Sequence, residues 1–363
     1  MTRKATIGDV AKQAKVSPAA VSRWLNGRLE LPEATGARIR AAVTALDYQP
    51  HAQARRLSKG KAEAIGIVVP DISNAFFALL AGEAERVAVA SGHDVVIWSS
   101  RNRIERELAC FDRLRGGYID GLLLITNHED DGRLAERIRA MPGRIVIIDE
   151  DVAGGEAPCF FVENERGGYE ATRHLIAHGH RRIAHIGGPR GVMSAIERAA
   201  GWRRALNEAG IAPEADWHVL TEYEVEPATR DAARLFAVDP LPTAIFAGSD
   251  AVALGVMTQA RRRGIAIPED VSLVGFDGMP INDLLGPPLT SIAQPIDDLG
   301  RQGAERLLAM IRGEPFAATR TRLPVKLVER ASVAAPRASG ISGTSPHEID
   351  ERGPLPLHRA QGE

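Results

Sequence analysis

The sequence predicts a multidomain α/β protein in which a small helix-turn-helix head precedes a two-lobed body of parallel α/β subdomains. Three observations support this prediction. The chain has 363 residues, which is too long for one compact domain. Residues 1–61 are basic and carry helical apolar patterns. Beyond them, short apolar runs alternate with amphipathic segments, a pattern typical of parallel sheets covered by helices on both faces.

Composition excludes disorder of the whole chain, because 44% of the residues are apolar and 25% are charged. The charge is unevenly distributed. Residues 1–61 hold twelve Lys and Arg residues but only four acidic residues. The whole chain has 45 Lys and Arg and 47 Asp and Glu residues, so the rest of it holds 33 basic and 43 acidic side chains. A basic head on an acidic body indicates a polyanionic partner for the head; the alternative is a solvated basic arm.

The head pattern predicts three helices. Thr6 and Asp9 form a capping-box pattern at the start of the first helix, and Ser17 is a good N-cap with Pro18 in the first turn of the second. A third helix is expected from about Pro32 to Leu46. Two short helices joined by a short turn, with a third packed behind, make a helix-turn-helix. The alternative is a three-helix module that binds protein.

The second helix would lie in the major groove of DNA, with its first turns facing the bases. The residues expected to contact DNA from the head are Thr6, Ser17, Pro18, Ala19, Ser22, Arg23 and Asn26. Arg23 could donate two hydrogen bonds to guanine. Ser17 and Ser22 are expected to hold phosphates, which set register rather than sequence.

The body pattern predicts two sets of strands and helices. The expected strands are residues 64–69, 94–98, 121–125, 145–148, 182–186, 243–246 and 271–276. The expected helices are residues 76–90, 103–115, 133–140, 194–209 and 251–263. Ligands of such sheets bind outside the carboxyl ends of the strands, so two facing lobes would hold a ligand between them.

The domain boundaries follow from these patterns. We expect a head over 1–50, a hinge over 51–61, a body over 62–333 and a disordered tail over 334–363, which is rich in Gly, Pro, Ser and charge. Within the body, we expect the first lobe to comprise 62–163 with 290–320, and the second 164–289 with 321–333.

The segment TIGDVAKQAKVSPAAVSRWLNG resembles the head of the LacI/GalR (lactose-repressor) family of bacterial transcriptional regulators, and the match continues through LDYQP into AQARRLSKGKAEAIGIVVPDI. The resemblance covers residues 5 to about 330. It implies that 51–60 form a hinge helix on the operator, with Leu57 wedged into the minor groove between base steps and Arg55 and Arg56 beside it. His51 stands where the family often has a capping Asn. The alternative is an ordinary basic linker.

The body is similar to periplasmic sugar-binding proteins of the ribose-binding type. That resemblance implies an effector site of Asp71, Asn74, Phe76, Phe77, Asp149, Glu150, Ser194, Arg198, Tyr223, Ser249, Asp250, Asp277 and Gln294. Carboxylates, amides and Arg can bond adjacent hydroxyls, and aromatic faces pack on sugar rings. Any one of these Asp residues could instead cap a helix or form a turn.

Two departures from the family pattern bear on the ligand. Glu150 stands where an Arg often follows the Asp, and Ser249 replaces a frequent Asn. The site therefore has more acceptors and fewer donors than a ribose pocket. A sugar, sugar acid or polyol is the first expectation. Arg198 is the evident partner for an anionic ligand, and a cationic or amine-bearing ligand stays open.

Other patterns carry less chemistry. We expect no cofactor and no metal, and we interpret His174, His178, His180 and His185 as structural residues rather than a zinc site. The loop 187–191 is Gly-rich but is neither GxGxxG nor a Walker pattern. Cys110 and Cys159 are expected in the core, and few cysteines suit a reducing cytosol. No Ser-His-Asp or Cys-His arrangement stands out.

Together these patterns predict a sequence-specific transcriptional repressor in the cytoplasm, controlled by a small polar ligand, sugar-like in chemistry, between the lobes. We expect a homodimer or larger oligomer on a palindromic double-stranded operator, and no membrane partner. The alternatives are an activator of the same family or an α/β enzyme acting on a carbohydrate. A transport protein would need an export signal, and MTRKATIGDV lacks the apolar core of one.

Overall fold

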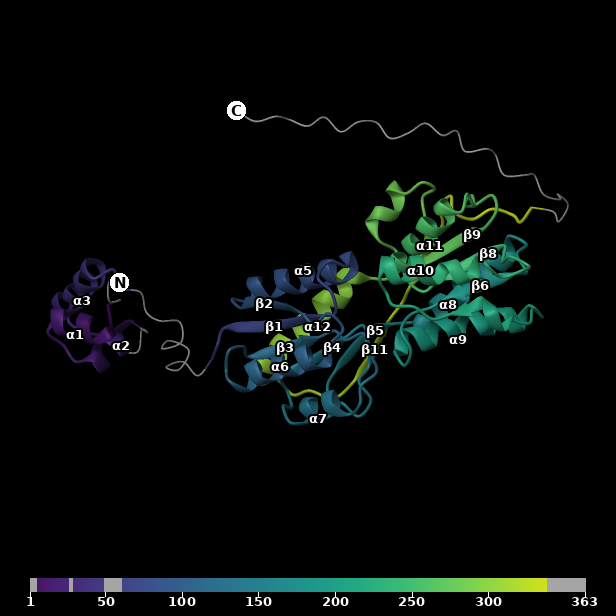
Figure 1. Cartoon of the computed structure of the whole chain (residues 1–363). Helices are drawn as coiled ribbons and strands as arrows, with labels where there is room; N and C mark the ends of the chain where they lie inside the picture. The colour runs from purple at the N-terminus through teal and green to yellow at the C-terminus, as the bar shows by residue number, and fades with distance from the viewer. Residues whose placement is uncertain (1–4, 26–28, 49–60, 338–363) are drawn as a thin grey trace, which may run out of the picture.

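The computed structural model describes residues 5–25, 29–48 and 61–337. Its head has three helices, α1 (Ile7–Ala14), α2 (Pro18–Leu25) and α3 (Glu33–Ala45). The core that they share consists of Val10, Ala11, Ala14, Val21, Ile39, Ala42 and Tyr48. The helix-turn-helix expected from the sequence is therefore confirmed (Figure 1).

Local hydrogen bonds explain where the head helices begin. The side chain of Thr6 accepts from the backbone N–H of Asp9 at 3.3 Å, and the Asp9 carboxylate accepts from the Thr6 backbone N–H at 2.9 Å. This reciprocal capping box satisfies two donors at the start of α1. Ser17 Oγ accepts from the Ala20 N–H at 3.1 Å at the start of α2. Between them Lys15 adopts a left-handed conformation, φ 57°, which ends α1 and forms the turn.

The first lobe of the body contains a six-stranded parallel sheet of order β11-β5-β4-β3-β1-β2. Its strands are β1 (Ala64–Val69), β2 (Asp94–Ser99), β3 (Gly121–Leu124), β4 (Ile145–Ile148), β5 (Cys159–Val162) and β11 (Arg320–Leu323). Its helices are α5 (Ala75–Ala90), α6 (Ile104–Arg115), α7 (Arg133–Arg139) and α12 (Ile296–Ile311). Helices α5 and α12 pack together over one face, and α6 and α7 over the other.

The second lobe contains a sheet of order β12-β10-β9-β8-β6-β7, parallel except for its antiparallel edge strand β12. Its strands are β6 (Ile183–Ile186), β7 (His218–Val219), β8 (Ala244–Ala247), β9 (Ser272–Asp277), β10 (Thr290–Ala293) and β12 (Lys326–Val328). Its helices are α8 (Asn164–Ala177), α9 (Met193–Glu208), α10 (Val225–Leu235) and α11 (Asp250–Arg262), with 3-10 turns η1 (Ala215–Trp217) and η2 (Pro280–Leu284).

The chain crosses between the lobes three times, and this corrects the expected lobe boundaries. Strand β10 pairs with β9, with Thr290 opposite Val274, so residues 290–293 belong to the second lobe and not to the first. Strand β11 pairs with β5 in the first sheet, so residues 321–323 belong to the first lobe and not to the second. The crossings therefore follow β5, β10 and β11.

The expected tail begins later than position 334. The carbonyl of Ala334 accepts from His180, 2.8 Å from Nε2, and the Ala334 N–H donates to Ser272 Oγ at 3.0 Å. Arg337 pairs with Asp270 at 2.6 Å. These contacts bind residues 334–337 to the second lobe; residues 338–363 lie outside the described part of the chain.

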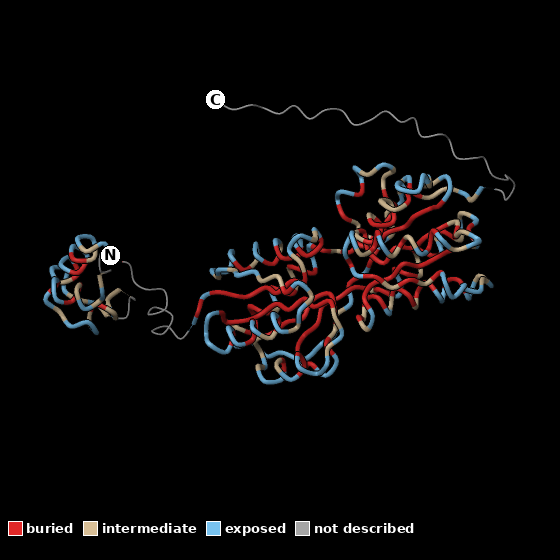
Figure 2. Tube along the Cα trace, in the orientation of Figure 1, coloured by how far each residue is buried: buried red, intermediate tan, exposed pale blue. Residues whose placement is uncertain are grey.

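One cluster of buried apolar residues has members in both lobes, and the buried segments of each lobe are red in Figure 2. It includes Phe76 and Leu80 of the first lobe and Phe276 of the second. Cys110 and Cys159 are buried free thiols, as expected. In the described residues, no helix has both the length and the apolar character that a bilayer span requires.

Candidate effector and DNA-binding sites

The outward face of α2 carries the residues expected to contact DNA. Val21 is fully buried, whereas Ser17, Pro18, Ala19 and Arg23 are exposed. Thr6 is exposed and Ser22 is half-buried. The fold thus presents the first turn of α2 and Arg23 to solvent, as a helix that enters a groove requires. The expected contacts Asn26, Arg55, Arg56 and Leu57 lie outside the described residues.

A cavity of about 350 Å³ lies between the lobes. Its walls come from the turn after β1, from the start of α10, and from the ends of β8 and β9; the polar lining residues are Asp71, Ser73, Asn74, Tyr223, Glu224, Glu226, Asp250 and Asp277. Asn74 Nδ2 donates to the backbone oxygen of Tyr223 across the gap at 3.3 Å. This position, outside the carboxyl ends of parallel strands, is the one expected for a ligand site.

Arg198 lies within a buried polar cluster next to this cavity and is 2% exposed. Its Nε donates to Asn164 Oδ1 at 2.9 Å and its Nη1 to the Gly248 oxygen at 2.6 Å. The guanidinium carbon lies 3.7 Å from the centre of the Phe276 ring. A Cβ on Gly168 would lie 2.2 Å from the Arg198 oxygen, so the close packing of α8 on α9 that holds Arg198 in place requires glycine there.

Asp277 connects Arg198 to the cavity. It is the last residue of β9 and has φ 121°, a conformation rare for a residue with a side chain. Its Oδ1 accepts from Gln294 Nε2 at 2.8 Å and lies 4.0 Å from Arg198 Nη1. Burial raises the pKa of Asp277 well above its usual range, the charge of Asp250 raises it further, and Arg198 opposes both effects.

Asp149 and Glu150 follow β4 and are both buried. Asp149 adopts φ 74°, and Glu150 Oε2 accepts from the backbone N–H of Ser194 at 3.2 Å. Asp149 Oδ1 and Glu150 Oε1 have no hydrogen-bond partner. Burial raises the pKa of both carboxyl groups, the charge of Asp149 raises that of Glu150 further, and Arg198 lowers both. Two adjacent buried carboxyl oxygens therefore lack partners, and they lie outside the lining of the cavity itself.

Tyr223 links the cavity to Ser194. The Tyr223 hydroxyl lies 3.2 Å from Ser194 Oγ, and the ring centre lies 5.5 Å from the Arg198 guanidinium carbon. Burial raises the pKa of Tyr223 to about 12, so its hydroxyl is protonated at neutral pH. A Cβ on Gly188 would lie 2.2 Å from the Tyr223 ring, so the glycine of the 187–191 loop makes room for this aromatic wall.

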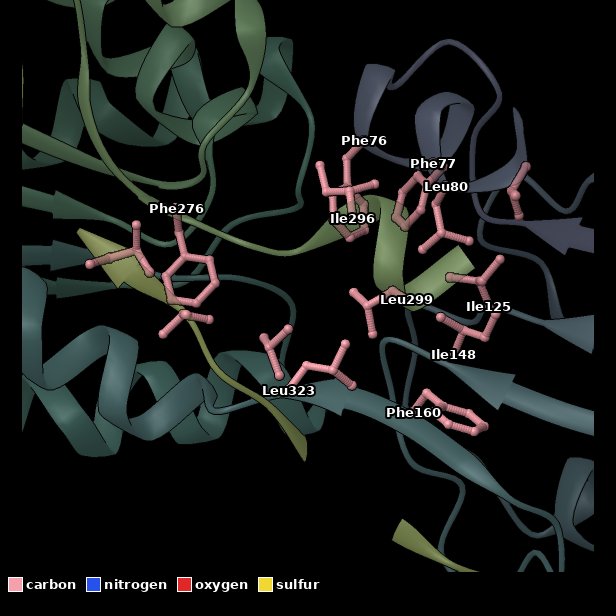
Figure 3. Packing of buried hydrophobic residues seen from close by; sticks show 14 of the residues in the cluster. Phe76, Phe77, Leu80, Ile125, Ile148, Phe160, Phe276, Ile296, Leu299 and Leu323 are labelled. Carbon is pink, nitrogen blue, oxygen red and sulfur yellow. The ribbon is translucent and has the colours of Figure 1, made fainter. Parts of the chain in front are cut away.

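Four residues expected in the effector site have structural roles here. Phe76 and Phe77, each 4% exposed, pack in the core rather than line the cavity, and Figure 3 shows them beside Ile296 and Leu80. Ser249 caps α11 by accepting from the Val252 N–H at 3.1 Å. Asp250 accepts hydrogen bonds from Ser291, from Asn282 and from the Met279 backbone. It lines the cavity, but those bonds occupy both of its oxygens.

Sequence reasoning missed several polar residues of this region, namely Ser73, Asn164, Glu224 and Glu226. Asn164 lies two positions after the end of β5, as the first residue of α8. The histidines lie elsewhere. His180 bonds to Thr243 and Ser272, and His185 Nδ1 lies 2.9 Å from the Phe246 oxygen. Within the described ranges no three potential metal ligands cluster.

Comparison with known proteins identifies the family. Residues 6–51 match the bacterial regulatory proteins of the lacI family, and residues 172–333 match the periplasmic binding protein-like domain. The ribose operon repressor of Halalkalibacterium halodurans is 37% identical over 328 residues, which are 90% of this chain and 96% of that protein. This chain belongs to the lacI family. It is a DNA-binding transcriptional repressor with a periplasmic-binding-protein-like body, and its relatives are transcriptional regulators rather than enzymes.

Two solved structures show the same architecture as this lacI-family protein. The lac repressor dimer bound to operator and the anti-inducer ONPF has a TM-score of 0.78 and 26% identity, covering 92% of this chain and 100% of that one. A LacI-family regulator of Enterococcus faecium with bound ribose has a TM-score of 0.67 and 28% identity, covering 76% and 100%. The expected fold, a head followed by a two-lobed body, is confirmed.

Proposed function

We propose that this repressor binds a palindromic operator as a homodimer and that a sugar-like ligand between its lobes controls that binding. The observation that carries the proposal is the set of buried, unpaired polar atoms between the lobes. Asp149 Oδ1, Glu150 Oε1 and Gln294 Oε1 are acceptors without donors. Buried polar groups without partners are costly, so a ligand that supplies hydroxyl or other donors there gains binding energy. A repressor acts on DNA inside the cell, so this proposal also implies a cytoplasmic location.

Exposed apolar side chains support the homodimer. Strand β2 is the outer strand of the first sheet, and its Val96 and Ile97 are 40% and 41% exposed. Leu79 and Val89 of the neighbouring helix α5 are 43% and 54% exposed. An edge strand and helix that expose apolar side chains together favour an interface with a second copy. Two copies related by a two-fold axis would present two α2 helices to a palindromic operator.

Closure of the lobes offers a route from ligand to DNA. The hinge segment enters the body at Ala62, and Asp120 holds this entry by accepting from the N–H groups of Ala62 and Glu63 at 2.8 and 2.7 Å. Asp120 directly precedes β3, which lies inside the first sheet. A shift of the first lobe on ligand binding would therefore move the start of the hinge. Couplings of this kind amount to about 1–3 kcal/mol.

The experiment is a fluorescence-anisotropy titration of the full chain against a library of palindromic DNA duplexes, with and without a panel of sugars and polyols. We expect sequence-selective, salt-sensitive binding by a dimer, and a change in affinity with at least one ligand. Binding that ignores sequence, or a monomer on every duplex, would contradict the operator part of the proposal.

A further inference from the structure

The cavity between the lobes has an unbalanced charge. Five carboxylates line it, those of Asp71, Glu224, Glu226, Asp250 and Asp277. None of the described residues that line this cavity is Lys, Arg or His. Hydrogen bonds to Ser73 lower the pKa of Asp71, which keeps it ionised at neutral pH. Burial raises the pKa of Asp250 and Asp277, but the lining still combines acidic groups with no basic one, which favours a cation over a neutral or anionic ligand.

The unpaired polar atoms of the adjacent cluster are themselves unbalanced. Three are oxygens, on Asp149, Glu150 and Gln294, which accept from a ligand when the two carboxyl groups are ionised, whereas one, Asn164 Nδ2, is a donor. All four residues are at least nine-tenths buried. A neutral hydroxyl can pair with either kind of atom, but an ammonium group has three donors and no acceptor. The excess of acceptors, two of them on carboxylates, matches the ammonium group better.

Arg198 corrects the imbalance only in part, because its charge lowers the pKa of Asp149 and Glu150 without an ion pair to either among the described residues. Two of its nitrogens already donate to Asn164 Oδ1 and to the Gly248 oxygen, and its remaining carboxylate partner within 4.0 Å is Asp277. Glu150 makes no ion pair among the described residues. Its one hydrogen bond comes from the backbone of Ser194, and burial with the charge of Asp149 raises its pKa to about 8 although Arg198 lowers it, so without a ligand the group is largely protonated at neutral pH. Buried carboxylates that lack a counter-charge are strongly disfavoured, and a ligand can supply the missing charge.

We propose that the effector of this repressor carries a protonated amine, as an amino- or imino-sugar does, and that the amine lies against Glu150 and Asp149. This rests on the proposed function, because it names the ligand class of the same site. Glu150 Oε2 caps α9 of the second lobe while Oε1 is free for the ammonium group. One carboxylate thus determines specificity and connects the ligand to the closed arrangement of the lobes.

The test compares ligands that differ only in the amine. Calorimetric titration of the full chain uses two matched pairs: 1,4-dideoxy-1,4-imino-D-ribitol with 1,4-anhydro-D-ribitol, and glucosamine with glucose. We expect the amine of at least one pair to bind about tenfold or more tightly than its neutral partner. Glu150→Gln keeps the size and the acceptor toward Ser194 but removes the charge. It should reduce that preference to within about twofold, while Glu214→Gln, at an exposed site, should leave it unchanged.

Each of the other outcomes contradicts one part of the proposal. Equal or tighter binding of the neutral partners would overturn the amine and leave the sugar-controlled repressor intact. An amine preference that survives Glu150→Gln would overturn the role of Glu150. Failure of every member of both pairs to bind the full chain would overturn the amine-bearing effector. A response to a neutral sugar in the operator titration would then show that the proposed function holds although the effector carries no amine.

Discussion

Glu150 of the first lobe caps a helix of the second, through a hydrogen bond of 3.2 Å from the backbone N–H of Ser194 to Glu150 Oε2. Helix α9 has no cap of its own, because its N-cap residue is Val192, which offers no side-chain acceptor. A carboxyl oxygen at this end of a helix satisfies an otherwise unpaired N–H. The contact exists only while the lobes are close together.

Glu150→Ala should therefore open the ligand-free body. Losing the cap leaves a buried N–H without a partner, which costs about 1–3 kcal/mol in the closed form and little in the open one. Pulsed electron resonance between spin labels introduced at the exposed positions Arg106 and Arg261, one on each lobe, should show a longer and broader distance distribution. Glu214→Ala serves as the control, and a distribution unchanged in Glu150→Ala would show that this hydrogen bond does not hold the lobes.

The pH dependence of stability should reveal the buried Glu150 carboxyl. Burial and the charge of Asp149 raise its pKa from 4.5 to about 8 in the folded protein. Because the folded pKa is raised, the protonated group contributes its full stability below 4.5 and loses it as the pH rises through about 8. Ligand-free Glu150→Gln should match the parent chain at acid pH and be the more stable at pH 8, by urea unfolding. Parallel curves for the two proteins would contradict this.

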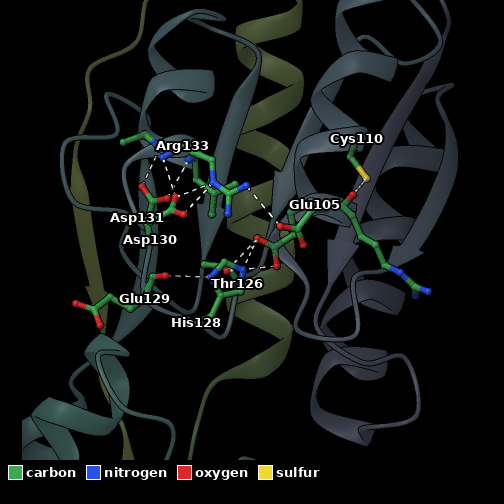
Figure 4. A network of polar contacts seen from close by, with 12 residues as sticks. Glu105, Cys110, Thr126, His128, Glu129, Asp130, Asp131 and Arg133 are labelled. Carbon is green, nitrogen blue, oxygen red and sulfur yellow. Dashed lines mark hydrogen bonds and ion pairs between the residues drawn. The ribbon is translucent and has the colours of Figure 1, made fainter.

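A second pH effect should come from His128. Its Nε2 lies 3.1 Å from Oε2 of the fully buried Glu107, which also accepts from Thr126 Oγ1 at 3.1 Å, and Figure 4 shows His128 beside Thr126 in this network. The hydrogen bond with Glu107 raises the pKa of His128. The stability that His128 contributes is therefore complete below its unfolded pKa of about 6.5 and lost as the pH rises through the higher folded value.

We expect His128→Ala to destabilise the protein by about 1–3 kcal/mol at acid pH, because Glu107 loses a partner, and by less at alkaline pH. Urea unfolding over the pH range measures this difference. His93→Ala, at a half-buried site where the ring Nδ1 lies 3.2 Å from the Ser91 oxygen, is the matched control. A loss that grows with pH would show that neutral His128 is the partner that Glu107 needs.

Asp120 should hold the entry of the hinge. Asp120→Ala removes both acceptors of the Ala62 and Glu63 N–H groups, so hydrogen exchange at these two amides should accelerate by about tenfold or more, the equivalent of 1.4 kcal/mol. Operator affinity should fall as well, because the hinge would start from a less defined position. Asp112→Ala, on the surface of α6, is the control. Unchanged exchange would rule out Asp120 as an anchor.

Arg23 should determine base preference. Because it is exposed on α2, Arg23→Ala should weaken binding to the best operator by about 1–3 kcal/mol and relax selectivity at one base pair. Anisotropy against operators with single substitutions measures both effects, with Arg262→Ala on the body as the control. A loss that is uniform across all sequences would instead assign Arg23 to a phosphate.

The sequence was sufficient wherever local patterns decide structure. The capping box of Thr6 and Asp9 and the N-cap of Ser17 formed as expected, and the apolar runs became strands with bounds that differ by at most one residue. Asp149 and Arg198 also lie close enough to interact, since the carboxyl end of β4 in the first lobe faces α9 of the second lobe.

Tertiary packing determines the features that local sequence patterns did not predict. Phe76 and Phe77 face the core because the rotation of α5 is set by its contact with α12, which no local pattern encodes. Strands β10 and β11 have similar lengths, and nothing within either segment specifies which sheet it joins. The sequence could not predict the cap that Glu150 provides, because its partner, the Ser194 N–H, lies 44 positions away in the chain.

The three crossings between the lobes also constrain the order of folding during synthesis. The first sheet needs β11 at residues 320–323, and the second needs β12 at residues 326–328. Neither lobe is complete until almost the whole body has left the ribosome, whereas the head finishes within its first 48 residues. At about 5–20 residues per second, a folded DNA-binding head precedes the domain that regulates it by many seconds on every nascent chain.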